Sequence, residues 1–276
     1  MKIGVVGLGL IGGSIAKSAK RNTKHTVYGY DINKDVIKSA IENKSIDGEL
    51  TKEKLSICDY VFIPLYPEAV IEYVKENASN FKENAVVIDC AGVKRVVCEK
   101  CFEIAEKSHF SFVGGHPMAG TQFSGYENSK ETMFHNAPFV LTPKENEDIL
   151  ILANAREVIM QLGFGRVSVM TPQKHDKLIA FTSQLAHVVS NAFVKSPSAM
   201  ERKGISAGSY KDLTRVAYLN ENMWTELFID NKDNLIFELD NIISELTKYS
   251  EALKNDDSGT LRQLLRDGRI AKEKAD

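Results

Sequence analysis

The chain has 276 residues, which exceeds the roughly 100–200 residues of one typical domain and predicts two units. Its 43% apolar and 26% charged residues are typical of a globular protein, and its formal net charge of -2 gives no general attraction to nucleic acid or anionic membranes. Because no apolar run approaches the roughly 20 residues that span a bilayer, we expect a cytoplasmic protein.

The first half of the chain alternates short apolar runs with amphipathic stretches. Buried strands are predicted over Ile3–Val6, Thr26–Tyr30, Tyr60–Pro64 and Ala85–Asp89. Helices are predicted between them, over Ser14–Arg21, Asp35–Asn43, Pro67–Ala78 and Lys94–Lys107. This alternation indicates a parallel sheet with helices on both faces. Further strands are predicted at Ser111–Val113, Phe139–Thr142 and Arg166–Val169.

The first predicted strand runs into a glycine-rich turn, Gly7-Leu8-Gly9-Leu10-Ile11-Gly12, which opens the next helix. In this context a G-x-G-x-x-G motif predicts dinucleotide binding, because Gly9 lets the backbone approach a pyrophosphate and Gly12 lets the helix pack closely. Asp31 ends the second strand, where its carboxylate can accept hydrogen bonds from a ribose and would repel the 2′-phosphate of NADP. We therefore expect NAD rather than NADP, the alternative being a turn that binds nothing. The predicted cofactor contacts are Gly7, Leu8, Gly9, Leu10, Ile11, Gly12, Asp31 and Leu65.

After Met170 the pattern becomes helical. One helix is predicted from Pro172 to about Lys195 and another from Asn220 to about Leu253, and the charged tail from Asn255 is expected to be partly mobile. The predicted fold is therefore α/β, with a Rossmann-type dinucleotide-binding domain over 1–170 followed by an all-helical domain over 171–276.

The four cysteines are Cys58, Cys90, Cys98 and Cys101, and we expect them to be reduced. Cys98 and Cys101 form a C-x-x-C, but no second pair or suitably spaced histidines accompany them. We interpret them as two small residues one helical turn apart, and no metal site is predicted.

A polar stripe follows the helix from Leu178 to Val194. At 100° per residue, Ser183, His187, Ser190 and Asn191 lie opposite the apolar side, with Gln184 at the edge of the stripe. A stripe without Lys or Glu indicates an enclosed surface, either a polar interface between helices or the wall of a substrate pocket.

Two further residues are candidates for chemistry. His116 stands in FVGGHPMAG, where a turn can tolerate a histidine or an imidazole can act as a base near neutral pH. Arg215 follows a glycine-containing loop, and its planar fork can hold a carboxylate or simply contribute a surface charge.

The segments GLGLIGGS, GYDIN, VGGHPMAGT and KDLTRVA…MWTELF, in order from Gly7 to about Asn234, resemble the prephenate dehydrogenase family. The resemblance implies a Rossmann-type domain and a helical domain that forms a homodimer. It also implies oxidative decarboxylation of prephenate to 4-hydroxyphenylpyruvate with NAD or NADP, a step of tyrosine biosynthesis. It further implies that His116 accepts the proton of the ring hydroxyl, that Arg215 holds a substrate carboxylate, and that Ser183 and His187 line the helical-domain wall.

The sequence departs from the family pattern in three respects. Gly92, in DCAGVK, stands where many relatives have a Ser that hydrogen-bonds the catalytic histidine. Gln184 stands where relatives often have a His, and its amide can hydrogen-bond substrate or cofactor but carries no charge. We expect no amino-acid-sensing domain after the helices, so any inhibition by tyrosine would be competition at the active site.

Two other functions remain open. An arogenate dehydrogenase would use the same fold and chemistry on a substrate with an ammonium in place of the keto group. A nucleotide-binding sensor without catalysis is suggested by the Ser missing at Gly92, although the presence of His116 and Arg215 argues against it. The apolar side of Asn220–Leu253 is expected to be covered, with a second copy of the chain as one candidate. Its residues are Met223, Leu227, Leu235, Leu239, Ile242 and Leu246.

Overall fold

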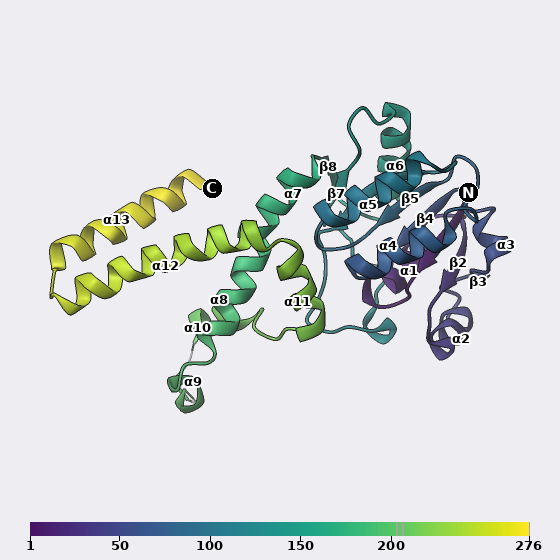
Figure 1. Cartoon of the computed structure of the whole chain (residues 1–276). Coiled ribbons are helices and arrows are strands. Elements are labelled where there is room, and N and C mark those ends of the chain that lie inside the picture. Colours follow the sequence, from purple (N-terminus) through teal and green to yellow (C-terminus); the bar gives the residue numbers. More distant parts are fainter. Residues whose placement is uncertain (203, 206, 276) are drawn as a thin grey trace.

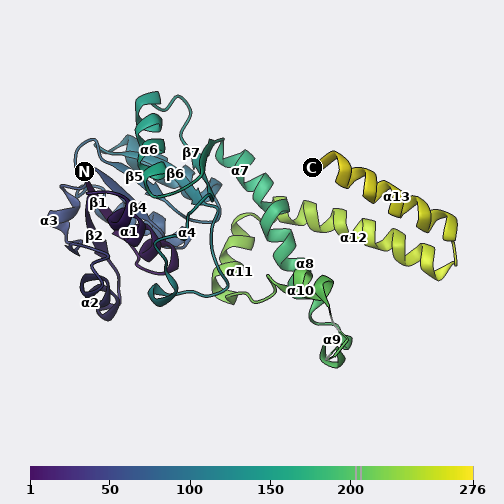
Figure 2. The same ribbon diagram turned by 180° about the vertical axis from the view of Figure 1, so that it is seen from behind.

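The computed structural model describes residues 1–202, 204–205 and 207–275. Figure 1 shows a sheet wrapped by helices in the N-terminal part, and helices from α7 onward that extend away from it. The view from behind in Figure 2 shows the same division, with α12 and α13 as an antiparallel pair at the far end. The predicted class, a Rossmann-type α/β domain followed by a helical one, is confirmed.

One 8-stranded sheet has the order β3-β2-β1-β4-β5-β6-β7-β8. Pairing is parallel from β3 through to β6, antiparallel between β6 and β7, and parallel between β7 and β8. The predicted parallel arrangement is thus confirmed for the first strands, and β7 with β8 adds an antiparallel edge. The strands are β1 (Lys2–Val6), β2 (Thr26–Tyr30), β3 (Gly48–Glu49), β4 (Tyr60–Ile63), β5 (Val86–Asp89), β6 (Ser111–Pro117), β7 (Pro138–Thr142) and β8 (Arg166–Val169).

Helices bury both faces of the sheet, which explains the nearly continuous apolar strands. On β4, Phe62 belongs to the cluster under α1, α2 and α6, whereas Val61 and Ile63 belong to the cluster under α4 and α5. The sequence did not predict β3, α3 or α6. The helices of this domain are α1 (Leu10–Asn22), α2 (Lys34–Glu42), α3 (Lys52–Leu55), α4 (Pro67–Asn77), α5 (Arg95–Glu106), α6 (Ile149–Gln161) and the short η1 (Tyr126–Asn128).

The C-x-x-C cysteines lie on α5 and are buried in the core as free thiols. The Cys98 thiol contacts the Thr142 hydroxyl at 3.3 Å, and burial raises the pKa of Cys98 to about 12. In the described parts of the chain, no group of three His, Cys, Asp or Glu side chains could hold a metal ion, and no helix is long and apolar enough to cross a membrane.

The helical part departs from the predicted two helices. A π-helical segment interrupts the first, and Asn231 separates the second into two. The tail from Asn255, expected to be partly mobile, forms helix α13, which contacts α12 and has Leu261, Leu264 and Ile270 half-buried. The elements are α7 (Pro172–Ile179), η2 (Ala180–Leu185), α8 (Ala186–Phe193), α9 (Ser198–Glu201), α10 (Gly208–Thr214), α11 (Glu221–Asp230), α12 (Lys232–Lys254) and α13 (Ser258–Ala275).

Part of the apolar side that was expected to be covered is covered by the chain itself. Leu227 and Leu235 are buried, whereas Leu246 is 59% exposed. Other apolar side chains of the far helices remain exposed, namely Ile236, Phe237, Ile243, Leu253 and Leu265.

A fully buried ion pair fixes the end of β5. Lys94 contacts the Asp89 carboxylate through Nζ and donates from the same atom to the Gly115 carbonyl at 2.7 Å. Asp89 also accepts from the backbone N–H groups of Ala91 and Gly115, at 2.9 and 3.0 Å. The pair therefore holds together the end of β5, the turn that follows it and β6.

Replacement of Lys94 by Met should lower the free energy of unfolding by about 3–5 kcal/mol, because it leaves the Asp89 carboxylate buried without its cation. Urea denaturation measures this loss. The matched control is Lys82→Met, which removes a half-exposed pair with Asp59 and should cost no more than about 1 kcal/mol. Equal losses in the two variants would contradict this account of the buried pair.

Candidate active site

The glycine turn between β1 and α1 has a separate steric reason for each glycine. Gly7 has φ +93°, and a Cβ there would lie 2.6 Å from the Leu65 side chain. A Cβ at Gly12 would lie 1.8 Å from the carbonyl oxygen of Gly7, so these two glycines are needed for packing alone. A Cβ at Gly9 would meet nothing within 4 Å. The space over Gly9 is therefore open, as a backbone that receives a phosphate requires.

Asp31 lies against this turn. Its carboxylate accepts from the Leu8 N–H at 2.8 Å and from the Asn33 N–H at 2.9 Å. Helix α1 begins at Leu10, and no side chain caps its first N–H groups. An uncapped helix start beside open backbone fits the pyrophosphate of a dinucleotide.

His116 reaches the same edge of the sheet through β6. The sequence predicted that this strand ends at Val113, but it continues to Pro117, and His116 pairs with Val140 of β7 rather than lying in a turn. Because β1, β4, β5 and β6 are parallel, their carboxyl ends share one edge. β6 is three strands from β1, so His116 lies on the order of 14 Å along this edge from the glycine turn.

The half-buried His116 ring is hydrogen-bonded to a second histidine. Its Nδ1 lies 2.9 Å from Nε2 of His175, and Nδ1 of His175 lies 2.8 Å from Oδ1 of Asp176. Burial holds the pKa of His116 well below its ordinary value, and the neighbouring His175 and Lys94 act in the same direction. Burial also lowers the pKa of His175.

Sequence reasoning missed His175 and Asp176. The buried residues of α7 are Pro172, His175, Asp176 and Ile179, which have the i, i+3, i+4, i+7 spacing of a core-facing stripe. A histidine and an aspartate in the middle of such a stripe are the signal that could have identified them. Two ionisable side chains on a buried face require buried partners.

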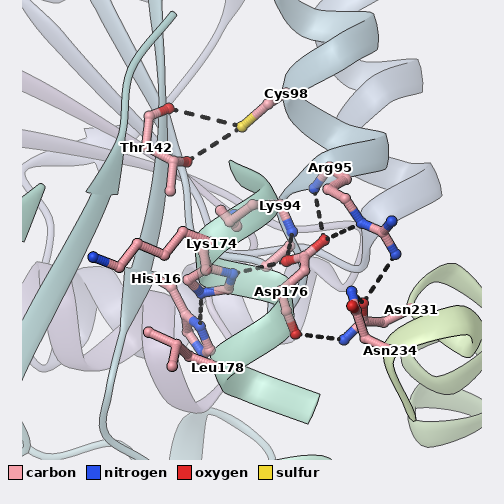
Figure 3. A network of polar contacts seen from close by, with 12 residues as sticks. Lys94, Arg95, Cys98, His116, Thr142, Lys174, Asp176, Leu178, Asn231 and Asn234 are labelled. Carbon is pink, nitrogen blue, oxygen red and sulfur yellow. Dashed lines mark hydrogen bonds and ion pairs between the residues drawn. The ribbon is translucent and has the colours of Figure 1, made fainter. Parts of the chain in front are cut away.

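Asp176 joins the two parts of the molecule, as Figure 3 shows. Its Oδ1 accepts from the backbone N–H of Lys94 at 2.7 Å, and its Oδ2 accepts from the N–H of Arg95 at 2.9 Å. These donors open α5, so Asp176 caps a helix of the other domain. Arg95 also binds Asp233, and Asn231 donates to the Asp176 carbonyl at 2.8 Å.

The residues of the polar stripe have different surroundings: Gln184 contacts other parts of the protein, whereas Ser183 lies at a half-buried surface. Gln184 is buried: its amide nitrogen donates to the Leu227 carbonyl and its oxygen accepts from Asn231. The expectation that Gln184 can bind substrate or cofactor is therefore corrected, because its amide is used in packing α11 and α12 against η2. Ser183 is half-buried in η2.

The remaining candidates lie in the helical part. Nδ1 of His187 lies 2.9 Å from the Val216 carbonyl oxygen. Burial lowers the pKa of His187, and the positive charge of the nearby Arg215 acts in the same direction. Arg215 is itself exposed. Within the described residues, no hydrogen bond or ring contact joins His187 or Arg215 to His116.

Comparison with known proteins identifies one family over both the N-terminal and the helical parts of the chain. The model of the prephenate dehydrogenase nucleotide-binding domain matches residues 15–176, and that of the prephenate dehydrogenase dimerization domain matches residues 171–267. Prephenate dehydrogenase of Bacillus subtilis is 29% identical over 93% of this chain and 71% of its own length. Cyclohexadienyl dehydrogenase of Zymomonas mobilis is 27% identical over 98% of this chain and 94% of its own.

Two solved structures resemble the whole fold. Prephenate dehydrogenase from A. aeolicus, in complex with hydroxyphenyl propionate and NAD+, has a TM-score of 0.87 and 30% identity over 100% of this chain and 98% of that one. Synechocystis arogenate dehydrogenase has a TM-score of 0.83 and 28% identity over 100% of both chains. Since the two family models together extend from residue 15 to residue 267, the chain belongs to the prephenate dehydrogenase family of oxidoreductases.

Proposed function

We propose that the protein catalyses the NAD-dependent oxidative decarboxylation of prephenate to 4-hydroxyphenylpyruvate. The observation that carries the proposal is the position of His116, a histidine with a lowered pKa at the same sheet edge as an open glycine turn. A dinucleotide bound along this edge would extend from the turn toward His116.

NAD, when bound, accepts the hydride that leaves the ring carbinol carbon. The chain's own groups then have two tasks. Neutral His116 takes the hydroxyl proton as the O–H bond breaks and a carbonyl forms. When CO2 leaves, the electron pair of the broken C–C bond makes the ring aromatic, and the oxygen on the ring takes a proton back from His116 to become the phenol. Arg215, exposed in the helical part, would hold a substrate carboxylate with its two-pronged guanidinium. Ser183 and His187 would line the substrate wall.

Asp31 supports NAD over NADP. Its carboxylate lies against the glycine turn, and a ribose bound there would bring a 2′-phosphate close to this negative charge, which would repel it. The A. aeolicus relative was solved with NAD+. The cofactor contacts that we propose are Gly7, Leu8, Gly9, Leu10, Ile11, Gly12, Asp31 and Leu65.

The helical domain supports assembly as a homodimer. A dimerization-domain model matches residues 171–267, and the apolar side chains exposed on α12 and α13 need a cover. Competition by tyrosine at the substrate site remains part of the proposal.

Gly9→Ala should weaken NAD binding by about tenfold or more, the equivalent of about 1.4 kcal/mol, because the methyl group would occupy the space of the pyrophosphate. The thermal midpoint without cofactor should be unchanged, since nothing in the protein meets that Cβ within 4 Å. Calorimetric titration with NAD measures the affinity, and Gly259→Ala on the distant α13 is the control. Wild-type affinity in Gly9→Ala would refute the placement of the cofactor.

Turnover tests the reaction itself. NADH absorbance with prephenate and then arogenate, each with NAD and with NADP, should show the highest kcat/KM for prephenate with NAD. His116→Asn should lower kcat by about 10²–10⁴-fold, as expected for loss of a general base. His109→Asn, at an exposed histidine whose Nε2 lies 2.8 Å from the Phe81 carbonyl oxygen, is the control.

The outcomes of this assay separate the candidate functions. A preference for arogenate would favour the alternative that the Synechocystis relative suggests. NAD binding without NADH production from either substrate would favour a non-catalytic sensor.

The pH profile should show the lowered pKa of His116. Because the base acts when neutral, activity is lost as the pH falls through this pKa, which burial places well below 6.5. We therefore expect kcat/KM for prephenate to stay constant down to pH 6.5 and to decline only below it. A decline centred at or above pH 6.5 would contradict the assignment of His116 as a desolvated base.

A further inference from the structure

We propose that His175 and Asp176 fix the tautomer of His116, so that His116 carries its ring proton on Nδ1 and presents a bare Nε2 to the substrate hydroxyl. The inference rests on the proposed function of His116 as a base. It assigns positioning roles to two residues of α7. These residues would replace the hydrogen bond to His116 that a Ser at position 92 supplies in many relatives.

The assignment starts at Asp176, whose oxygens are surrounded by donors. Oδ1 accepts from the Lys94 N–H, and Oδ2 accepts from the N–H and Nε of Arg95, the latter at 3.3 Å. The hydrogen bonds from His175 and from the backbone lower the pKa of Asp176 despite its burial. The group is therefore a carboxylate near neutral pH, and a carboxylate can only accept hydrogen bonds.

The proton positions then follow along the chain of contacts. Nδ1 of His175 must donate to Asp176, because Oδ1 has no proton to give. Burial lowers the pKa of His175, so this ring is neutral and its Nε2 is an acceptor. Nδ1 of His116, 2.9 Å from that Nε2, must then be the donor. A neutral His116 has no second proton, which leaves its Nε2 free to accept one.

The contact geometry agrees with this direction. The two rings lie 5.1 Å apart between centroids and are tilted by 60°, so the bond runs from one nitrogen to the other and the rings do not stack. The fully buried Lys94 lowers the pKa of both histidines, which disfavours an extra proton on either ring before substrate binds. Asp89 and Asp176 are the nearby anions, and Asp89 is occupied by Lys94.

Little room is left at position 92 for a side chain that could hydrogen-bond His116. A Cβ at Gly92 would lie 3.3 Å from both methyl groups of Leu227, a buried side chain of α11. The helical domain thus occupies this space with a leucine and meets His116 with the imidazole of His175 instead.

The first test requires no turnover. Nitrogen-15 NMR of the histidine side chains, with the NAD-bound protein and His116→Asn for assignment, shows which ring nitrogen of His116 carries the proton near neutral pH. We expect a protonated Nδ1 and a bare Nε2. A proton on Nε2 overturns the proposal, even if the enzyme proves to oxidise prephenate.

The second test compares two replacements of His175. The amide oxygen of His175→Gln can accept from Nδ1 of His116, so kcat should stay within about tenfold of wild type. His175→Leu offers no acceptor to Nδ1 of His116. Its kcat should therefore fall by about 10²–10⁴-fold, as when a catalytic histidine loses the partner that holds its tautomer. Its KM should change by less than about threefold. His109→Gln is the matched control.

A purely structural role predicts a different pattern. Both His175 variants would then lose the same activity in proportion to lost thermal stability, with no rescue by Gln, and this result would overturn the proposal. If neither substrate is turned over by the wild-type protein, the proposed function fails, whereas the NMR result still decides the tautomer. Asp176 is unsuitable for substitution because it also caps α5.

Discussion

The buried carboxylate of Asp176 is the contact on which the arrangement of this molecule depends. It lies on the first helix after the sheet, yet its two oxygens accept the N–H groups that open α5 on the other side of the domain junction. One of these oxygens, Oδ1, also orients His175 and thereby His116. A single anion thus sets both how the helical part sits on the sheet and how the candidate base is directed. Loss of the interdomain contact would therefore disturb the chemistry as well as the packing.

The parallel sheet supplies the second constraint. Because the strands from β1 to β6 point the same way, their carboxyl ends place the glycine turn, the Asp89–Lys94 pair and His116 on one edge without any long loop. The change of direction at β7 ends this series directly beside His116. The candidate base therefore belongs to a strand that pairs with β5 over Ser111–Val113 and with β7 over Gly114–Pro117, and a paired strand suits a group that must keep a fixed position relative to a bound cofactor.

Sequence patterns predicted the features that depend on residues close together in the chain, namely the main strands and the glycine turn. Apolar runs separated by amphipathic stretches located the main strands of the sheet, and the glycine spacing located the turn. The helix of the charged tail was not predicted, because its few half-buried apolar residues, Leu261, Leu264 and Ile270, are hidden by the charged composition around them. For Gln184 the polar stripe left open a helix interface or a pocket wall, because helical periodicity gives the side of a helix but not its partner, here the Leu227 carbonyl and Asn231.

The partners of His116 show most clearly where such reasoning ends. His175 is 59 residues away in sequence, and the two rings meet only because α7 crosses the junction and is held there by Asp176. Resemblance to the family indicated that the hydroxyl that aids the histidine in many relatives is missing at Gly92 or is replaced by a group from elsewhere in the chain. The fold instead fills the space over Gly92 with Leu227 and provides a hydrogen-bond partner from a different helix. What fixes the tautomer of His116 is a hydrogen-bond acceptor for its Nδ1, and that acceptor can come from any residue type. The absence of one serine from the sequence therefore does not show that the acceptor is absent.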